Sequence, residues 1–531
     1  MSTEAAAGGH GGPAQRIAAG YAVAGQALEL GTVVVDGDAD PTAQIRIPLA
    51  TINRHGLVAG ATGTGKTKTL QLIAEQLSAA GVAVLMADVK GDLSGLSRAG
   101  EANDKAAARA KDTGDNWTPT AFPVEFLSLG TSGVGVPVRA TISSFGPILL
   151  SKVLGLNATQ ESTLGLIFHW ADQRGLPLLD LKDLRTVISH LTSDEGKAEL
   201  KALGAVSPTT AGVILRALVN LEAEGADTFF GEPELRPDDL IRVDSQGRGI
   251  ISLLEFSGQS LRPVLFSTFL MWVLADLFSY LPEVGDLDKP KLVFFFDEAH
   301  LLFTDASKAF LEQVEQTVKL IRSKGVGVFF CTQLPTDLPN TVLSQLGARI
   351  QHALRAFTPD DQKALSKTVR TYPKTDVYDL ESTLTSLGIG EAVVTVLSEK
   401  GAPTPVAWTR MRVPRSLMGT IGTDAVAAAA QASPLQAVYG QTIDRVSAHE
   451  MLDAKYAPVP DAPPEQPPRG KYDPLPWPDD IQVPPMPAPV ESRGPGMWEE
   501  ILKNPTVKSA INTGVREITR SIFGTGRRGR K

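Results

Sequence analysis

Several features that would point to particular protein classes are scarce in this 531-residue chain. Cys331 is the single cysteine, which excludes a disulfide framework and a cysteine-based zinc site within one chain. Positive charge is not in excess, since 51 basic residues stand against 59 acidic ones and give a net charge of −8. A nucleic-acid-binding surface would therefore have to be a local basic groove or pore. No internal repeat with a period of about 20 to 50 residues is visible.

Targeting signals and long apolar runs are scarce as well. The start of the chain has an early Glu4 and many glycines, but no charged stretch followed by an apolar one. We therefore interpret residues 1–20 as a disordered tail and not as a signal peptide. The most apolar segment, residues 263–281, contains Asp276 and is barely long enough to span a bilayer, so it predicts a buried helix. These features predict a cytoplasmic protein without a transmembrane segment.

The order of apolar patterns predicts an α/β fold. HGLVAG (55–60) and VAVLMAD (82–88) are expected strands, and the segment between them has apolar residues at helical spacing. Such a unit implies a parallel sheet with a right-handed crossover. Residues 141–245 show helical patterns and few strand signals, so they predict a helical insertion. Further strands are expected at 248–256, 291–299, 325–333, 348–356 and 390–398.

Two segments near the C-terminus differ in composition from the rest. Residues 456–496 are Pro-rich and predict a linker, or an arm that docks through Tyr472 and Trp477. Residues 497–531 predict an amphipathic helix with a basic end, whose apolar face holds Ile511, Val515, Ile518 and Ile522. That helix would bind a partner, an anionic surface or nucleic acid, or else pack on its own protein.

The stretch GATGTGKT (60–67) has the spacing of a phosphate-binding loop, or P-loop. Glycines let backbone N–H groups turn inward around a phosphate, and the following helix N-terminus adds partial positive charge. Lys66 would bridge the β- and γ-phosphates, and the Thr67 hydroxyl would coordinate Mg²⁺. The alternative, a bare glycine-rich turn, is disfavoured by the strand before it and the helix after it. The predicted nucleotide-binding residues are Gly60, Ala61, Thr62, Gly63, Thr64, Gly65, Lys66, Thr67 and Lys68.

KLVFFFDEAH (291–300) is an expected buried strand that ends in two adjacent carboxylates. Such a pair is costly unless a cation or water chemistry uses it. Asp297 fits a Mg²⁺ ligand, and Glu298 fits the residue that orients or deprotonates an attacking water, which marks a hydrolase. The alternative is an acidic cluster that caps the next helix. His300 is either a helicase-type motif residue or an ordinary histidine at a helix start.

Polar residues also follow two neighbouring strands. Gln333 ends the strand GVFFCTQ, where it would sense the γ-phosphate or position water, or else be an ordinary strand-end amide. Asp88, Lys90 and Asp92 follow the strand at 82–88 and either couple to the nucleotide or form a turn.

Arginines are candidates for completing the site from a neighbouring subunit. In ring ATPases such an arginine stabilises the charge of phosphoryl transfer. Each candidate is otherwise an ordinary salt-bridged or exposed arginine. The candidates around the last core strands are Arg322, Arg349 and Arg355.

The order of these motifs resembles the HerA/FtsK branch of the RecA-like P-loop ATPases. The resemblance is carried by GATGTGKT, DVKGD, FFFDEAH and TQLP. Longer segments, among them NRHGLVAGATGTGKTKTLQLIAEQLS and QHALRAFTPDDQKA, are similar to the bacterial YjgR-like family, which has a HerA-like helicase C-terminal domain. The resemblance runs from about residue 25 to 455 and leaves out the Pro-rich arm and the basic tail. Leu334 stands where FtsK-type translocases commonly have an arginine.

The resemblance implies a RecA-like ATPase core in two parts, residues 21–140 with the P-loop and residues 246–455 with the Walker B carboxylates and the sensor. It implies ATP and Mg²⁺ as ligands and a homo-oligomer, expected to be a hexameric ring. The implied roles are Mg²⁺ binding by Thr67 and Asp297, water activation by Glu298 and sensing by Gln333.

Two functions stay open at this point. One is an oligomeric ATP-driven motor that acts on DNA as a helicase or translocase, which the motif order and the resemblance favour. The other is a nucleotide-driven switch or remodeller that acts on protein partners, for example through the C-terminal arm, or on a small phosphorylated molecule. The acidic balance, the insertion and the lack of a winged-helix DNA-reading module favour the second. A scaffold without catalysis is disfavoured because Lys66 and Glu298 are both present.

Overall fold

The computed structural model describes residues 12–88, 91–202, 206–255, 263–285, 287–304 and 306–456. All of them belong to one compact unit, Met1–Pro458, and the chain has a second unit, Val459–Lys531. The expected Pro-rich arm and basic C-terminal helix lie outside the described residues, as do Lys90 and most of the expected N-terminal tail.

The strands of the described residues form a single large sheet. They are β1 (Ala27–Val35), β2 (Asp38–Pro48), β3 (Gly56–Ala59), β4 (Ala83–Asp88), β5 (Val124–Leu129), β6 (Val136–Val138), β7 (Ile251–Glu255), β8 (Leu292–Phe296), β9 (Val326–Thr332), β10 (Ala348–Gln351), β11 (Glu391–Thr395) and β12 (Ala407–Met411). Their order is β2-β1-β12-β11-β10-β3-β9-β8-β4-β7-β5-β6. Neighbours from β10 to β6 run parallel, and those from β2 to β10 run antiparallel. The predicted α/β fold with a mainly parallel sheet is confirmed.

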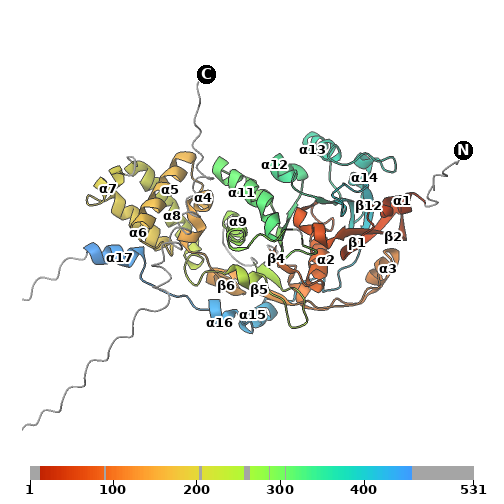
Figure 1. The fold of residues 1–531 in the computed structure, drawn as a ribbon, viewed down its shortest axis with the longest axis horizontal. Coiled ribbons are helices and arrows are strands. Elements are labelled where there is room, and N and C mark those ends of the chain that lie inside the picture. Colours follow the sequence, from red (N-terminus) through yellow and green to blue (C-terminus); the bar gives the residue numbers. More distant parts are fainter. Residues whose placement is uncertain are drawn as a thin grey trace, which may run out of the picture. The chain divides into compact units, whose positions relative to one another are not determined.

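Helices connect the strands and cover the sheet (Figure 1). They are α1 (Pro13–Ala19), α2 (Lys66–Ala79), α3 (Asp104–Asp112), α4 (Ile142–Leu154), α5 (Ala158–Gln173), α6 (Leu181–Thr192), α7 (Lys197–Ala202), α8 (Pro208–Ala223), α9 (Pro263–Tyr280), α10 (His300–Phe303), α11 (Lys308–Ile321), α12 (Asn340–Leu343), α13 (Pro359–Val369), α14 (Leu380–Ser386), α15 (Thr423–Gln431), α16 (Gln436–Tyr439) and α17 (Ala448–Tyr456).

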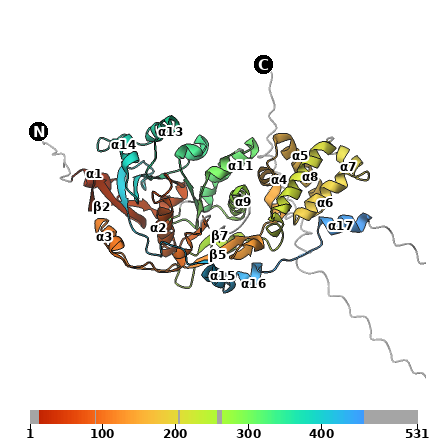
Figure 2. The ribbon, with the colours of Figure 1, turned by 180° about the vertical axis from the view of Figure 1, so that it is seen from behind.

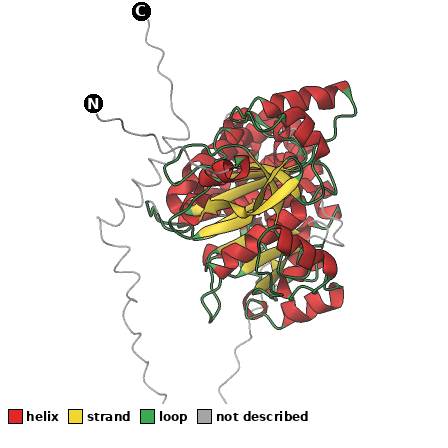
Figure 3. Cartoon of the chain, turned by 90° about the vertical axis from the view of Figure 1, so that its right-hand side faces the viewer, coloured by secondary structure: helices red, strands yellow, loops and turns green. Residues whose placement is uncertain are grey.

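The central strands are buried on both faces. On β8, Phe294 and Phe296 belong to the core that includes α9, α11 and the helices of the insertion. Val293 and Phe295 belong to the other core, which includes the apolar side of α2. Figure 3 shows the strands with helices on both sides. A strand between two cores carries a continuous apolar run, which is why LVFFF contains no polar residue.

The segment 141–245 contains the helices α4 to α8 and lies between β6 and β7 in the chain. Helix α4 packs on α5, α9 and α11, and α6 packs on α8 and on α17. Figures 1 and 2 show these helices grouped together with α17 beside them. Helix α17 ends the described part of the chain. We call residues 435–456, which include it, the C-terminal strap. Its Arg445 forms two bonds of 2.6 Å to Glu232.

The structure differs from the sequence-based prediction in two places, the expected N-terminal tail and the last expected strand. Within the expected N-terminal tail, Pro13–Ala19 forms helix α1, which packs on β1 and β2 through the buried Ile17. The segment 390–398 is the last strand predicted, but a further strand, β12, follows it in the chain and lies between β11 and β1 in the sheet. The sequence of β12, AWTRM, is short and contains the polar pair Thr409 and Arg410 without strict apolar and polar alternation, so its strand signal is weak.

Helix α9 is the buried helix expected at 263–281. Leu270, Met271 and Leu274 are at most 1% exposed and lie in the main core. Among the described residues no helix combines the length and apolar character needed to cross a membrane.

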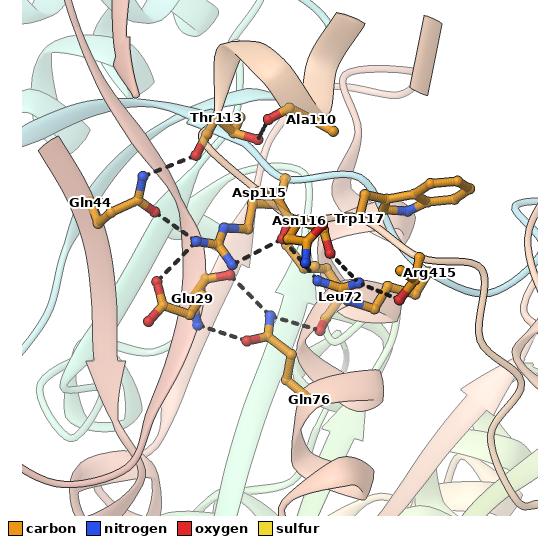
Figure 4. Close-up of polar contacts among 12 residues, drawn as sticks. Glu29, Gln44, Leu72, Gln76, Ala110, Thr113, Asp115, Asn116, Trp117 and Arg415 are labelled. Atoms are coloured by element: carbon orange, nitrogen blue, oxygen red, sulfur yellow. Dashed lines mark hydrogen bonds and ion pairs between the residues drawn. The ribbon is translucent and has the colours of Figure 1, made fainter. Parts of the chain in front are cut away.

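A polar network joins helix α2 to β1, the second strand from one edge of the sheet (Figure 4). The Asp115 carboxylate, whose side chain is 4% exposed, pairs with Arg415 at 2.8 Å and with Arg412 at 3.4 Å. Arg412 also pairs with Glu29 of β1 at 3.1 Å. Gln76 of α2 accepts a bond from the Glu29 amide at 2.7 Å and donates to the Glu29 carbonyl at 3.0 Å. These contacts fix α2 relative to β1.

Replacement of Asp115 by alanine should lower the midpoint of thermal or urea unfolding. Two arginines would lose a buried carboxylate, which costs about 2 kcal/mol in such settings. As a control, Asp194→Ala removes a carboxylate from an exposed pair with Lys197 and should leave the midpoint unchanged. Equal shifts in the two variants would contradict a stabilising role for the network.

Candidate functional site

Residues 60–65 form a tight loop between β3 and α2. Gly60 and Gly65 have φ angles of 152° and 116°, which glycine adopts without strain. A Cβ on Gly60 would also lie 2.6 Å from the Cβ of His352. At Gly63, by contrast, a Cβ would meet no atom within 4 Å. The loop is therefore closely packed where it leaves the strand and open at its middle.

Lys66 begins α2, and its ammonium group folds back over the loop. Its Nζ donates to the carbonyl oxygen of Gly60 at 2.6 Å and to that of Ala61 at 3.2 Å. Within the described part of the chain Lys66 makes no ion pair with a carboxylate. The α2 N-terminus adds partial positive charge at the same place. This unneutralised positive charge suits an anion such as a phosphate group.

Asp297 and Glu298 directly follow β8. Glu298 has a φ of 46°, which is uncommon for a residue with a side chain, and its amide donates to Asp297 Oδ1 at 2.9 Å. Backbone strain of this kind concentrates at functional sites. The Glu298 side chain is 24% exposed, and its Oε2 lies 3.5 Å from Nδ1 of His300. Glu298 is thus held in a strained turn with its carboxylate within reach of solvent.

These charged groups follow neighbouring parallel strands, so they lie at the same end of the sheet, around Cys331. Cys331 lies in β9, between the loop strand β3 and β8. Burial raises the pKa of its thiol well above the usual value, Asp297 raises it further, and Lys66 lowers it. The structure therefore brings the predicted lysine and carboxylates together at the carboxyl end of the central strands.

The end of β9 is fastened to the loop by backbone bonds. The amide of Gly60 donates to the carbonyl oxygens of Thr332 and Gln333 at 3.2 and 3.1 Å. The Thr332 hydroxyl donates to Asp337 Oδ2 at 2.7 Å, and the Leu334 amide donates to the same oxygen at 2.9 Å. Gln333 lies beside the first glycine of the loop, and its side chain is exposed.

His352 is a site residue that the motifs did not reveal. Its ring lies in a buried position, with Nε2 2.9 Å from Thr69 Oγ1 and Nδ1 2.8 Å from the Glu391 carbonyl oxygen. Burial, with a smaller effect of the Lys66 charge, lowers the pKa of His352 to about 4. Because a carbonyl only accepts, the neutral ring carries its proton on Nδ1 and accepts from Thr69. The ring links α2 to β11 under the loop.

Lys68 is directed toward a different group of charges. Burial lowers the pKa of Lys68, whereas Asp92 and Asp88 act to raise it. Burial raises the pKa of Asp88 to about 6. The Asp88 carboxylate accepts from the amides of Asp92 and Leu93 at 3.1 and 2.8 Å. These bonds form a turn, which is one of the two roles predicted for Asp88.

The three candidate arginines lie in different places. Arg355 lies beside the P-loop of the same chain, where its Nη2 donates to the Thr62 carbonyl oxygen at 3.3 Å. Arg349 of β10 donates to the Thr371 carbonyl oxygen at 3.3 Å. Arg322 is exposed and precedes β9, at the end of the strand opposite the loop. Of the three, the structure places only Arg355 near the P-loop of the same chain.

The residues present fit a nucleoside triphosphate with Mg²⁺. The open middle of the loop and the Lys66 ammonium suit phosphate oxygens. Mg²⁺ bound together with phosphates needs only one or two protein ligands, which Thr67 and Asp297 can supply. No group of three or more His, Cys, Asp or Glu side chains gathers as a metal site in the described residues.

The sheet order, the loop and the carboxylates define a RecA-like P-loop NTPase fold. The chain belongs to the family described as "Helicase HerA-like C-terminal", whose model matches residues 34–531. The expected resemblance is thereby confirmed. Its expected end near residue 455 is wrong, because the match includes the C-terminal arm and tail.

Individual relatives are more distant. A "Probable helicase MJECL08" of Methanocaldococcus jannaschii is 34% identical over 116 residues, which cover 21% of this chain and 20% of that protein. The chain thus matches about a fifth of the length of this curated relative. The plasmid coupling protein TrwB in complex with ADP and Mg²⁺ is 16% identical, with 73% of this chain and 91% of that chain covered and a TM-score of 0.48. VirB4 of Thermoanaerobacter pseudethanolicus is 15% identical, with 73% and 97% covered and a TM-score of 0.45.

The buried, neutral His352 should make stability depend on pH. Its pKa is about 4 when folded and 6.5 when unfolded, so only the unfolded chain takes up this proton between these values. The contribution of His352 to the free energy of unfolding is complete above pH 6.5 and falls by about 3 kcal/mol as the pH decreases to 4. It changes no further below pH 4. His352→Asn should flatten the dependence in urea unfolding measured from pH 7 to 4.5. An unchanged slope in this variant would contradict the assignment.

Proposed function

We propose that the chain is a Mg²⁺-dependent ATPase that works as an oligomeric motor on DNA, a helicase or translocase. The observation that carries the proposal is that the unneutralised Lys66 lies with Asp297 and Glu298 at the carboxyl ends of neighbouring parallel strands. Membership of a HerA-like helicase family supports DNA as the substrate of the motor.

The chain's own residues support hydrolysis in the following way. Backbone N–H groups of the loop and the Lys66 ammonium hold the β- and γ-phosphates. Thr67 and Asp297 would hold a Mg²⁺ ion, which would supply positive charge to neutralise these phosphates. Glu298 orients the attacking water and accepts its proton, and the amide of Gln333, which follows β9 beside Gly60, would contact the same water or the γ-phosphate. The positive φ of Glu298 supports this role, because backbone strain concentrates at functional sites.

A neighbouring subunit would complete the site. Arg349 and Arg355 donate to carbonyl oxygens of their own chain, whereas the exposed side chain of Arg322 makes no hydrogen bond or ion pair among the described residues. Arg322 is therefore the arginine best suited to reach a site on the next subunit. We take a hexameric ring as the assembly, by analogy with the family.

A second candidate is a switch or remodeller that uses ATP to act on a protein partner or a small phosphorylated molecule. The net charge of −8 and the helical insertion favour it. The C-terminal strap beside the insertion exposes Ile443 and Val446, which are 54% and 70% exposed and could contact a protein.

The roles of Lys66 and Glu298 are tested by substitution. Lys66→Ala should abolish measurable ATP turnover and weaken ATP binding, because the phosphates lose their cation. Glu298→Gln should keep ATP binding but lower turnover about 10²- to 10⁴-fold, because the amide cannot accept a proton. Phosphate release and nucleotide titration measure the two effects. The matched surface changes Lys363→Ala and Glu312→Gln should behave like the wild type, and undiminished turnover in either site variant would refute the assignment.

The motor function is tested by ATP turnover with and without duplex DNA, together with native mass measurement in ATP and Mg²⁺. We expect DNA to stimulate turnover several-fold and a six-subunit particle to form. Stimulation should weaken as salt increases, since phosphate contacts release counterions. ATP turnover without DNA binding at low salt, from a monomer or dimer, would instead establish the switch.

A further inference from the structure

If the P-loop binds ATP as proposed, the order of the strands indicates on which side of the loop the nucleoside lies. Glu298 and Gln333, the groups assigned to the γ-phosphate, follow β8 and β9. These strands lie on one side of the loop strand β3, and β10 and β11 lie on the other. A triphosphate with its γ end toward β9 therefore directs its nucleoside toward β10 and β11.

A turn at residues 388–390, just before β11, borders the loop on that side. The Gly390 amide donates to the Thr64 carbonyl oxygen at 3.0 Å. A Cβ on Gly65 would lie 3.1 Å from the Gly390 nitrogen, so the turn packs directly on the end of the loop. The turn and the loop thus form one continuous surface.

Side chains from distant parts of the chain hold this turn in place. Arg109 of α3 donates to the carbonyl oxygens of Gly390 and Ile389, each at 3.1 Å. The Glu391 carboxylate accepts from the Gly388 amide at 3.0 Å and from the Trp408 ring nitrogen at 3.0 Å. Such support preorganises a short turn and leaves little entropy to be lost on binding.

The side chain that this fixed turn presents is Ile389, which is 76% exposed. A single exposed apolar residue is ordinary on a protein surface. Ile389 differs because its backbone is anchored to the loop and to Arg109, on the side where the nucleoside must leave the phosphates. An apolar side chain there can cover the flat face of a base but offers no polar group to its edge.

We propose that Ile389 forms the wall on which the nucleobase packs, and that Arg109 positions this wall through the turn. The wall recognises the apolar face of the base. The phosphates are bound separately, by the loop and Lys66. Affinity for a nucleotide then depends on Ile389, whereas affinity for inorganic triphosphate does not.

The test compares ADP with inorganic triphosphate, each titrated with Mg²⁺ into the full chain by calorimetry. Ile389→Ala should weaken ADP binding about 5- to 10-fold, because apolar area is no longer covered by the base. Inorganic triphosphate, which has no base, should bind the variant and the wild type equally. Arg109→Ala should show the same selective loss for ADP, since the turn is released while the loop is unchanged.

Val219→Ala, at an apolar residue of α8 that is 44% exposed, serves as the matched control and should change neither affinity. Unchanged ADP binding by Ile389→Ala would overturn the inference, as would an equal loss of ADP and triphosphate, which would mean that the loop itself is disturbed. Failure of the wild type to bind either ligand would instead overturn the proposed function.

Discussion

The structure of the site depends on backbone hydrogen bonds that fix the start of the loop between two strands. The Gly60 amide bonds to the end of β9, the Ala61 amide to Ala353 at 2.9 Å, and the His352 amide to Ala59 at 2.7 Å. These bonds need no particular side chain, so the register of three central strands decides where a phosphate can lie. The apolar runs that hold those strands between two cores are thus also what positions the chemistry.

Buried polar side chains add a second layer of support around this frame. His352 connects α2 to β11, and the network of Asp115 with its arginines connects α2 to β1. Each joins elements that are far apart in the sequence, so α2 is held on both of its sides. A helix held in this way presents its N-terminus and Lys66 in a fixed position, which electrostatic binding of phosphate requires.

Sequence reasoning could predict the features that occupy one contiguous stretch. The loop, its flanking strand and helix, and the carboxylates after LVFFF are each readable from local spacing, and the structure gathers them at one edge of the sheet. His352, Arg109 and the turn at Ile389 were not predictable, because their roles exist only through partners in distant segments. Strand β12 was not predicted because its five residues include two adjacent polar ones and form no continuous apolar run, and α1 was not predicted because the helix is short and carries a single buried isoleucine. Sequence alone offers no basis for distinguishing the candidate arginines. In the structure Arg355 lies beside the P-loop, whereas Arg322 lies at the opposite end of β9.

The position of β12 has a consequence for how the chain is made. Among the described strands, the hairpin of β1 and β2 joins the rest of the sheet only through β12. About 360 residues separate the hairpin from β12, which at 5–20 residues per second corresponds to roughly 20–70 s of synthesis. During that time β1 is an open strand edge of nine residues on the nascent chain, available to chaperones or to a neighbouring polypeptide. Once Ala407–Met411 has emerged from the ribosome it can pair with Gly31–Val33 in the middle of that edge, so the sheet is completed only after these residues are synthesised.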